Sequence, residues 1–159
     1  MVCSAILFSC EETAKEKPIE NTTVTAEPPK SAPLLSYSLV KTHPHDSTCF
    51  TEGYFFHEGQ LYESSGAPDH LPATRSMFGI VNPTTGKVEV KGELDRNKYF
   101  GEGITILNGK LYQLTWQGQT CFMYDAKSFK PVGQFNYMSK EGWGLTNDGK
   151  HLIMSDGTN

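Results

Sequence analysis

The stretch FTEGYFFHEGQLY, residues 50–62, returns 50 residues later as FGEGITILNGKLY, residues 100–112. Both copies begin with Phe, carry Glu-Gly at the third and fourth positions, and end in Gly-x-Leu-Tyr. A looser copy, GWGLTNDGKHLIMSDG, follows at residues 142–157, with Trp143 in the place of the glutamate. Repeats of about 40–50 residues built from short strands are typical of β-propeller blades. Equivalent positions of such blades face one axis, so Glu52, Glu102 and Trp143 are predicted to converge on one pocket.

Around these repeats, short apolar runs alternate with turns rich in Gly, Pro and Asn, which is the pattern of β-hairpins. The first blade is expected from strands at residues 54–56, 60–63, 77–81 and 87–90, and the second from strands at residues 104–107, 110–115, 120–124 and 131–135. A third unit begins at Leu145 and continues over residues 152–155, and one further strand is predicted at residues 35–40. No segment has the period of an amphipathic helix. The sequence therefore predicts an all-β fold.

The predicted blades are too few to form a closed propeller. Closed propellers have about 4–8 blades, whereas residues 34–159 supply roughly two and a half. We therefore expect residues 34–159 to be a partial β-propeller domain, the beginning of a longer, C-terminally truncated protein. In that arrangement the strand at residues 35–40 would complete the last blade.

Charge and cysteine spacing argue against several classes of function. The net charge is −4 and no block of Lys and Arg stands out. Nucleic-acid-binding proteins usually carry a patch of basic residues, so this class is not expected. The four cysteines form no CxxC pair, so no structural zinc site is expected. For Cys49 and Cys121, two buried thiols are favoured over a disulfide. His43 and His45 form an HxH pair without a third ligand, so a loop is favoured over a metal site.

The first residues have the character of a sorting signal. Residues 1–10, MVCSAILFSC, contain an apolar run too short to span a bilayer. Its end, LFSC, resembles a bacterial lipoprotein cleavage box with Cys10 as the acylated residue; an unstructured leader is the alternative. Residues 11–33 are rich in Glu, Thr, Lys and Pro and are expected to form a disordered tether. This organisation predicts an exported periplasmic or cell-surface protein, held to the membrane only through Cys10.

Longer motifs carry a resemblance to a known family. In order along the chain they are FTEG (50–53), LYESSG (61–66), TGKVEV (85–90), YFGEGIT (99–105), LYQLTW (111–116), EGWGLT (141–146) and LIMSDG (152–157). Over residues 43–159 the chain resembles the glutamine cyclotransferases, the plant and bacterial type of glutaminyl-peptide cyclotransferase. The resemblance implies a five-bladed propeller that converts the N-terminal glutamine of peptides to pyroglutamate and releases ammonia. It implies neither a cofactor nor a metal.

The resemblance also implies roles for individual residues. Glu102 corresponds to the proton-transfer residue, acting as general base and then general acid. Phe100, Trp116 and Trp143 correspond to aromatic walls of the substrate pocket. Phe50 and Glu52 lie at the same pocket, and relatives carry Gln or Glu at the position of Glu52.

Two departures from the family pattern are expected to matter. The family's later pocket residues, an Asn, a Trp and a Lys, would lie beyond Asn159, which puts the activity of this chain in doubt. Residues 67–75, with Pro68 and Pro72, replace a shorter link in the family. They predict a remodelled loop at the rim of the pocket.

For the implied reaction, the protein has to orient the substrate and transfer a proton. The α-amine of the substrate attacks its own γ-carboxamide carbon, and ammonia leaves. One carboxyl group can take the proton from the amine and return it to the leaving nitrogen, a contribution of about 10²–10⁴ in rate. Aromatic walls around Glu102 would exclude water and raise its pKa towards the working range.

Two other functions are compatible with the same residues. A non-catalytic surface lipoprotein could use the aromatic pocket to bind peptides or sugars, because a fold does not fix a function. An inactive truncated product, unable to close its ring, is the second alternative. Saturable peptide binding without turnover would indicate the former, and broad, non-cooperative melting the latter.

Overall fold

The computed structural model describes residues 33–158 of the chain. Among these residues, 33–38 belong to one unit and 39–158 to a second, compact unit. Cys10 and nearly all of the expected tether lie outside the described residues. The strand predicted at residues 35–40 is wrong, because this stretch is irregular and its side chains are exposed. A strand needs a neighbour to take up its backbone hydrogen bonds, and an apolar alternation alone does not supply one.

Two four-stranded antiparallel sheets and a hairpin make up the second unit, with the strands of each sheet in sequence order. The first sheet holds β1 (Phe50–His57), β2 (Gln60–Gly66), β3 (Met77–Val81) and β4 (Val88–Glu93). The second holds β5 (Gly101–Leu107), β6 (Lys110–Thr115), β7 (Thr120–Asp125) and β8 (Pro131–Asn136). The hairpin pairs β9 (Leu145–Asn147) with β10 (Leu152–Met154). These are two blades and the first half of a third, which confirms the predicted all-β propeller architecture.

Repeated tight turns join the first two strands of each blade. Glu58 and Gly59 have φ of 48° and 77°, and Asn108 and Gly109 have φ of 51° and 71°. Two consecutive residues with positive φ are what a two-residue hairpin turn of the primed type requires. Glycine meets this requirement without strain, which is the physical reason why it recurs in the sequence repeat.

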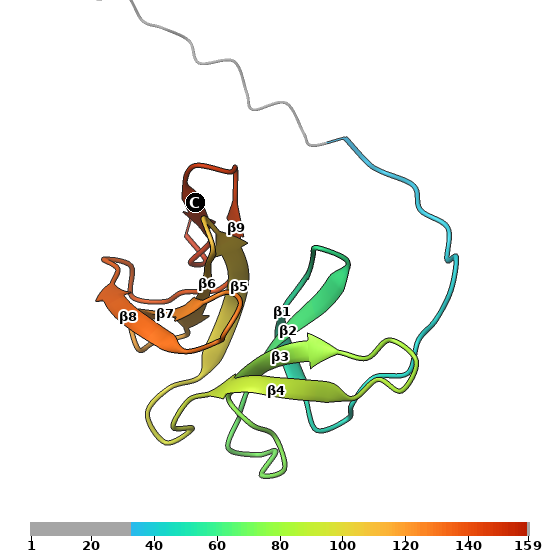
Figure 1. Ribbon diagram of the computed structural model, residues 1–159, viewed down its shortest axis with the longest axis horizontal. Coiled ribbons are helices and arrows are strands. Elements are labelled where there is room, and N and C mark those ends of the chain that lie inside the picture. The colour runs from blue at the N-terminus through green and yellow to red at the C-terminus, as the bar shows by residue number, and fades with distance from the viewer. Residues whose placement is uncertain (1–32, 159) are drawn as a thin grey trace, which may run out of the picture. The chain divides into compact units, whose positions relative to one another are not determined.

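The first strands of successive blades lie next to one another. Contacts join β1 to β5 and β5 to β9, and Figure 1 shows the two four-stranded sheets fanning out from the region where β1, β2 and β5 approach each other. This is the radial order of propeller blades. It brings equivalent positions of the repeat to a common centre.

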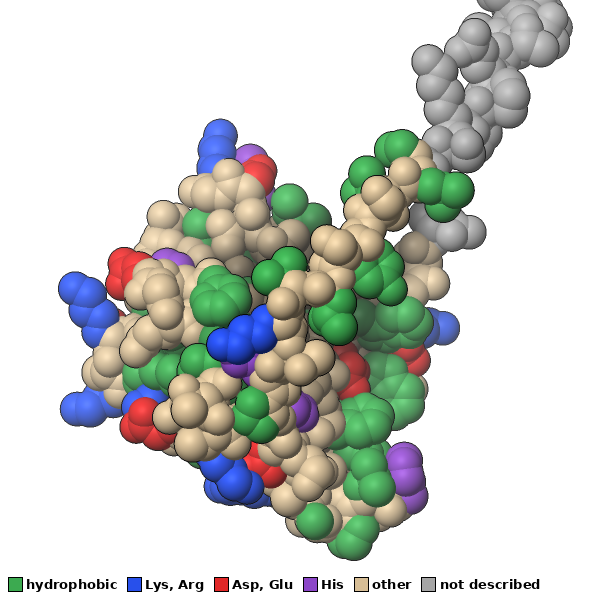
Figure 2. All heavy atoms as spheres, turned by 90° about the vertical axis from the view of Figure 1, so that its right-hand side faces the viewer, with side chains coloured by type: hydrophobic (Ala, Val, Ile, Leu, Met, Phe, Trp, Pro, Cys, Tyr) green, Lys and Arg blue, Asp and Glu red, His purple; other side chains and the backbone are tan. Residues whose placement is uncertain are grey.

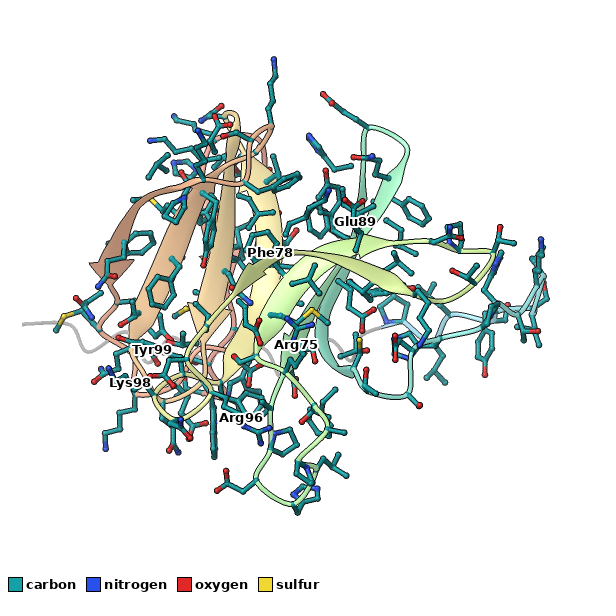
Figure 3. The ribbon with its side chains drawn as sticks, turned by 60° about the horizontal axis from the view of Figure 1, so that its bottom comes forward. Arg75, Phe78, Glu89, Arg96, Lys98 and Tyr99 are labelled. Atoms are coloured by element: carbon teal, nitrogen blue, oxygen red, sulfur yellow. The ribbon has the colours of Figure 1, made fainter. Side chains whose placement is uncertain are left out.

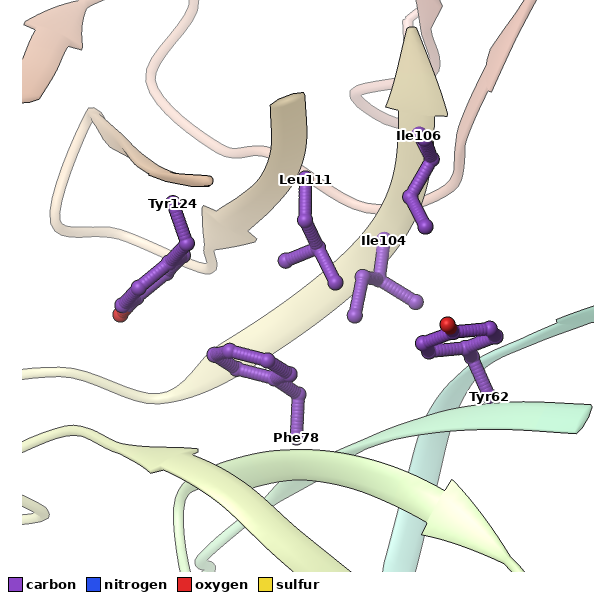
Figure 4. Close-up of a cluster of buried hydrophobic side chains, with 6 residues drawn as sticks. All are labelled: Tyr62, Phe78, Ile104, Ile106, Leu111 and Tyr124. Carbon is purple, nitrogen blue, oxygen red and sulfur yellow. The ribbon is translucent and has the colours of Figure 1, made fainter. Parts of the chain in front are cut away.

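A hydrophobic core joins the two complete blades. Tyr62 and Phe78 come from the first sheet, and they meet four side chains of the second, Ile104, Ile106, Leu111 and Tyr124 (Figure 4). The rings of Phe78 and Tyr124 are 4.7 Å apart between centroids, and Phe78 and Leu111 are fully buried. Because the core spans both sheets, burial fixes the blades relative to each other.

The surface carries both signs of charge. On the face shown in Figure 2, lysine and arginine side chains are spread among carboxylates and apolar groups. Within residues 33–158 there is no helix with the length and apolar character that a bilayer span requires. Cys49 and Cys121 are both free thiols, and burial raises the pKa of each to about 12.

Candidate functional site

Glu52 and Glu102 both stand at β-bulges in the first strand of their blades. In the first blade, Thr51 pairs with Ser65 and Gly53 with Ser64, so Glu52 is an extra residue without a partner. In the second, the register shifts in the same way between Gly101 and Ile104. A bulge re-aims a side chain out of the alternation of its strand. The Glu-Gly repeat therefore encodes a repeated bulge that turns each carboxyl towards the neighbouring blade.

The glycine after each glutamate allows the next blade to approach closely. A Cβ added to Gly53 would lie 2.8 Å from a methyl carbon of Ile104 on β5. A Cβ added to Gly103 would lie 2.4 Å from the backbone nitrogen of Leu145 and 2.4 Å from the backbone oxygen of Trp143. No other residue fits these positions without displacing the adjacent strand.

The Glu52 and Glu102 side chains are hydrogen-bonded to each other. Glu102 is 7% exposed. Burial, followed by the negative charge and hydrogen bond of Glu52, raises the pKa of Glu102 from 4.5 to about 8. Burial also raises the pKa of Glu52, while its hydrogen bond to Glu102 acts in the opposite direction. Two carboxyl groups this close cannot both ionise easily, so the pair holds one proton near neutral pH.

Three aromatic side chains, from the start of β1, the residue before β5 and the residue after β6, form a row. The rings of Phe50 and Phe100 meet edge to face with centroids 6.0 Å apart, and those of Phe100 and Trp116 do the same at 6.0 Å. Trp116 remains 40% exposed and Phe50 37% exposed. Edge-to-face contact between rings is a favoured geometry. The row is therefore fixed in place and still presents apolar surface to a ligand.

Glu141 is a site residue that the sequence did not single out. Its carboxylate accepts a hydrogen bond from Trp143 Nε1 at 2.9 Å and another from Gln117 Nε2 at 3.0 Å. These bonds, and a further one from the Trp116 side chain, lower the pKa of Glu141. Glu141 thus orients Trp143 and adds negative charge near Glu102. Its place two residues before Trp143, in the EGWGL motif, was the available signal.

Backbone hydrogen bonds tie the segments of the site together. The amide of Trp116 donates to the carbonyl oxygen of Phe100 at 2.9 Å, and the amide of Gly142 donates to that of Trp116 at 2.9 Å. The amide of Gly103 donates to the carbonyl oxygen of Trp143 at 2.8 Å. These bonds join the second blade to the third unit. Trp143 lies in the part contributed by the third unit and is 44% exposed.

The predicted site residues in the described part of the chain fall into three connected groups. One is the pair Glu52 and Glu102, another the row of Phe50, Phe100 and Trp116, and the last is Trp143 with Glu141. His43 and His45 belong to none of them. His43 Nδ1 lies 2.8 Å from the carbonyl oxygen of Pro83, and His45 Nε2 lies 2.9 Å from Oε1 of Glu63. Both imidazoles therefore contact residues of the first blade and not of the site.

Chemically, the groups at the site suit a proton transfer to or from a cationic or amine ligand. A carboxyl with a pKa near 8 can accept and return a proton at neutral pH. The aromatic faces can receive an ammonium group. Among residues 33–158, no cluster of three or more His, Cys, Asp or Glu side chains has the geometry of a metal site.

Comparison with known proteins finds the same family over the whole described region. The sequence model of the glutamine cyclotransferase family matches residues 4–159. A glutaminyl-peptide cyclotransferase of Arabidopsis thaliana is 40% identical over 121 residues, which are 76% of this chain and 36% of the plant protein. The crystal structure of Myxococcus xanthus glutaminyl cyclase is similar with a TM-score of 0.60 and 26% identity, over 76% of this chain and 47% of that one.

The chain thus spans about a third of the length of the plant relative and about half of the bacterial one. The match of the family model extends over nearly all residues of the chain, including every motif that contributes to the site. The protein is a member of the glutamine cyclotransferase family.

Proposed function

We propose that this chain carries the proton-transfer half of a glutaminyl-peptide cyclotransferase site, which converts an N-terminal glutamine to pyroglutamate and releases ammonia. The observation that carries the proposal is the buried Glu102 carboxyl, whose pKa lies near 8 beside Glu52. Family membership and the relative from Arabidopsis thaliana supply the reaction class.

In the proposed reaction a proton moves twice. The α-amine nitrogen bonds to the γ-carboxamide carbon, and Glu102 takes a proton from that nitrogen. When the tetrahedral intermediate collapses, the C–N bond to the former amide nitrogen breaks, and Glu102 returns the proton so that ammonia leaves. A peptide α-amine has a pKa of about 7.7–8.0, close to that of Glu102, so neither transfer is steeply uphill. Every step uses protein carboxyls and needs no metal.

The aromatic row would supply orientation. Phe50, Phe100 and Trp116 give the glutamine side chain an apolar wall against which to fold back on its amine. Holding the two reacting groups together in this way replaces part of the entropy cost of ring closure. Glu141 acts as a positioning residue, since it holds the indole of Trp143 and not the reacting atoms.

Glu52→Gln is expected to shift the acid limb of the pH profile. The active complex needs an ionised Glu102 and a neutral amine, so kcat/KM of the wild type should rise with pH through about 8 and level off above it. Removing the Glu52 charge removes one cause of the raised pKa of Glu102, while burial remains. The pKa of Glu102 falls, so the acid limb moves to lower pH. An unchanged acid limb would contradict the assigned role of Glu52.

The first test of the proposed function is ammonia release from a short peptide with N-terminal glutamine, compared with the spontaneous rate. Release above that rate supports the reaction class for this chain. Binding of the peptide without release would instead support the non-catalytic binding propeller. The same peptide with N-terminal asparagine is the matched control, because its shorter side chain cannot close a five-membered lactam.

We further propose that the protein is exported and anchored through a lipid on Cys10. The support is the LFSC sequence at residues 7–10 and the polar composition of residues 11–33. In bacterial cells fed labelled fatty acid, Cys10→Ala is expected to remove the label and to shift the protein from the membrane to the soluble fraction. Cys3→Ala serves as the control and should keep the label. A Cys10→Ala protein that still carries the label would contradict the proposal.

A further inference from the structure

A polar cleft of about 550 Å³ adjoins the aromatic row. Phe100 and Trp116 line it from one side. Its remaining walls come from loops at the same end of the two blades: Ala67–His70, Arg96–Lys98, and Gln117 with Gly118. The volume lies within the range of about 300–1,000 Å³ that small-ligand sites occupy. The cleft therefore shares two side chains with the proposed reaction site and extends beyond it.

One wall of the cleft is the rim loop, residues 67–75, which joins β2 to β3. Arg96 clamps this loop. Its guanidinium donates hydrogen bonds to the carbonyl oxygens of Pro72 at 3.0 Å, Thr74 at 2.9 Å and Pro68 at 3.5 Å. In Figure 3, Arg96 lies at the base of the loop between β2 and β3. A planar guanidinium with several fixed donors suits this role.

The opposite wall is equally well ordered by local contacts. The Asp95 backbone oxygen accepts hydrogen bonds from the amides of Lys98 and Tyr99, each at 2.9 Å, and its carboxylate accepts one from the amide of Asn97 at 3.0 Å. The Tyr99 ring packs edge to face on Phe122 at 5.0 Å. Both walls are thus held by the fold before any ligand arrives, which lowers the entropy cost of binding.

We propose that this cleft is the subsite for the residues that follow the N-terminal glutamine of a peptide substrate, an inference that rests on the proposed function. Ring closure involves only the first residue, so the rest of the peptide has to leave the pocket past its wall. Phe100 and Trp116 belong to the proposed reaction site and also line the cleft. The exposed polar side chains of Asp69, His70 and Asn97 offer donors and acceptors for peptide amides.

Gln117 connects the cleft to the reaction site. It lines the cleft, and its Nε2 donates to the carboxylate of Glu141, which also holds the indole of Trp143 at 2.9 Å. A peptide in the cleft would therefore lie against a side chain that helps to position the tryptophans. Arg96 lines the cleft, but its guanidinium is engaged by the carbonyl oxygens of the rim loop, so we assign it as the positioning residue of the subsite.

The test uses unreactive product ligands, so that binding is measured without turnover. Titration calorimetry compares a pyroglutamyl tetrapeptide amide of small polar residues with pyroglutamic acid amide. The wild-type chain is expected to bind the tetrapeptide about tenfold more tightly, the equivalent of one or two hydrogen bonds. Arg96→Ala should lose most of this difference while its affinity for pyroglutamic acid amide stays unchanged. Lys87→Ala, which removes a cation elsewhere on the first blade, should keep the difference.

A second variant separates the subsite from the stability of the loop. Asp69→Ala combined with His70→Ala changes only exposed positions, and it should also weaken the tetrapeptide alone. Equal binding of both ligands by the wild type overturns the subsite and leaves the proposed function standing. Failure to bind either ligand, together with no ammonia release, sinks the subsite and the proposed function together.

Discussion

Glu102→Gln is expected to lower the rate of ammonia release from a Gln-initiated peptide by about 10²–10⁴, the usual contribution of a general acid–base residue. Glutamine has nearly the same shape and can keep a hydrogen bond to Glu52, but it cannot take or return a proton. The measurement is the initial rate in a coupled ammonia assay at several pH values. Glu89→Gln, at an exposed position on β4, is the control and should keep the wild-type rate.

Glu102→Gln is also expected to change how the free energy of unfolding depends on pH. Because the pKa of Glu102 is about 8 in the folded chain and near 4.5 when exposed, the folded state holds this proton more tightly. The free energy of unfolding therefore falls as pH rises from about 4.5 to about 8. Glu102→Gln lacks this loss and should be more stable than the wild type above pH 8, by on the order of 2–4 kcal/mol. Below pH 4 the two should be equal.

The predicted loss of rate and the predicted gain of stability can each be contradicted independently. A Glu102→Gln protein that retains more than about a tenth of the wild-type rate would refute the proton-transfer role. Equal melting temperatures of variant and wild type at pH 9 would show that Glu102 is not held in the buried, raised-pKa environment described here. Circular dichroism of both proteins at pH 7 checks that the sheets are intact.

Gly103→Ala is expected to damage the fold and the site together. The added methyl group would lie 2.4 Å from two backbone atoms, Leu145 N and Trp143 O, and backbone cannot swing aside as a long side chain can. The joint between β5 and β9 has to open, which also strains the hydrogen bond from the Gly103 amide to Trp143. We expect a loss of about 2–3 kcal/mol in the free energy of unfolding and about 10² in rate through misplacement of Trp143.

Gly144→Ala is the matched control for this prediction. Its added methyl group would meet only the hydroxyl oxygen of Ser155, at 3.0 Å, and a side chain can adjust. Urea denaturation and the ammonia assay compare the two variants. A Gly103→Ala protein as stable and active as Gly144→Ala would mean that the two strands do not approach as closely as described.

Local sequence patterns were enough to predict the repeat unit and its hairpins. The spacing of Glu-Gly and Gly-x-Leu-Tyr predicted the hairpins of both blades, since positive φ at Gly59 and Gly109 is a local requirement of the turn. It also placed Glu52 and Glu102 at equivalent positions. Local patterns of this kind are readable because the physical constraint acts within a few residues.

The contacts between these elements depend on long-range pairing and burial, which local patterns do not encode. The bulges at Glu52 and Glu102 arise from pairing with β2 and β6, and the raised pKa of Glu102 arises from burial and from a charge 50 residues away in the chain. The role of Glu141 and the Arg96 clamp on the rim loop likewise depend on contacts between segments distant in sequence. The failed strand at residues 35–40 shows the same limit, because alternation is a local property and strand pairing is not.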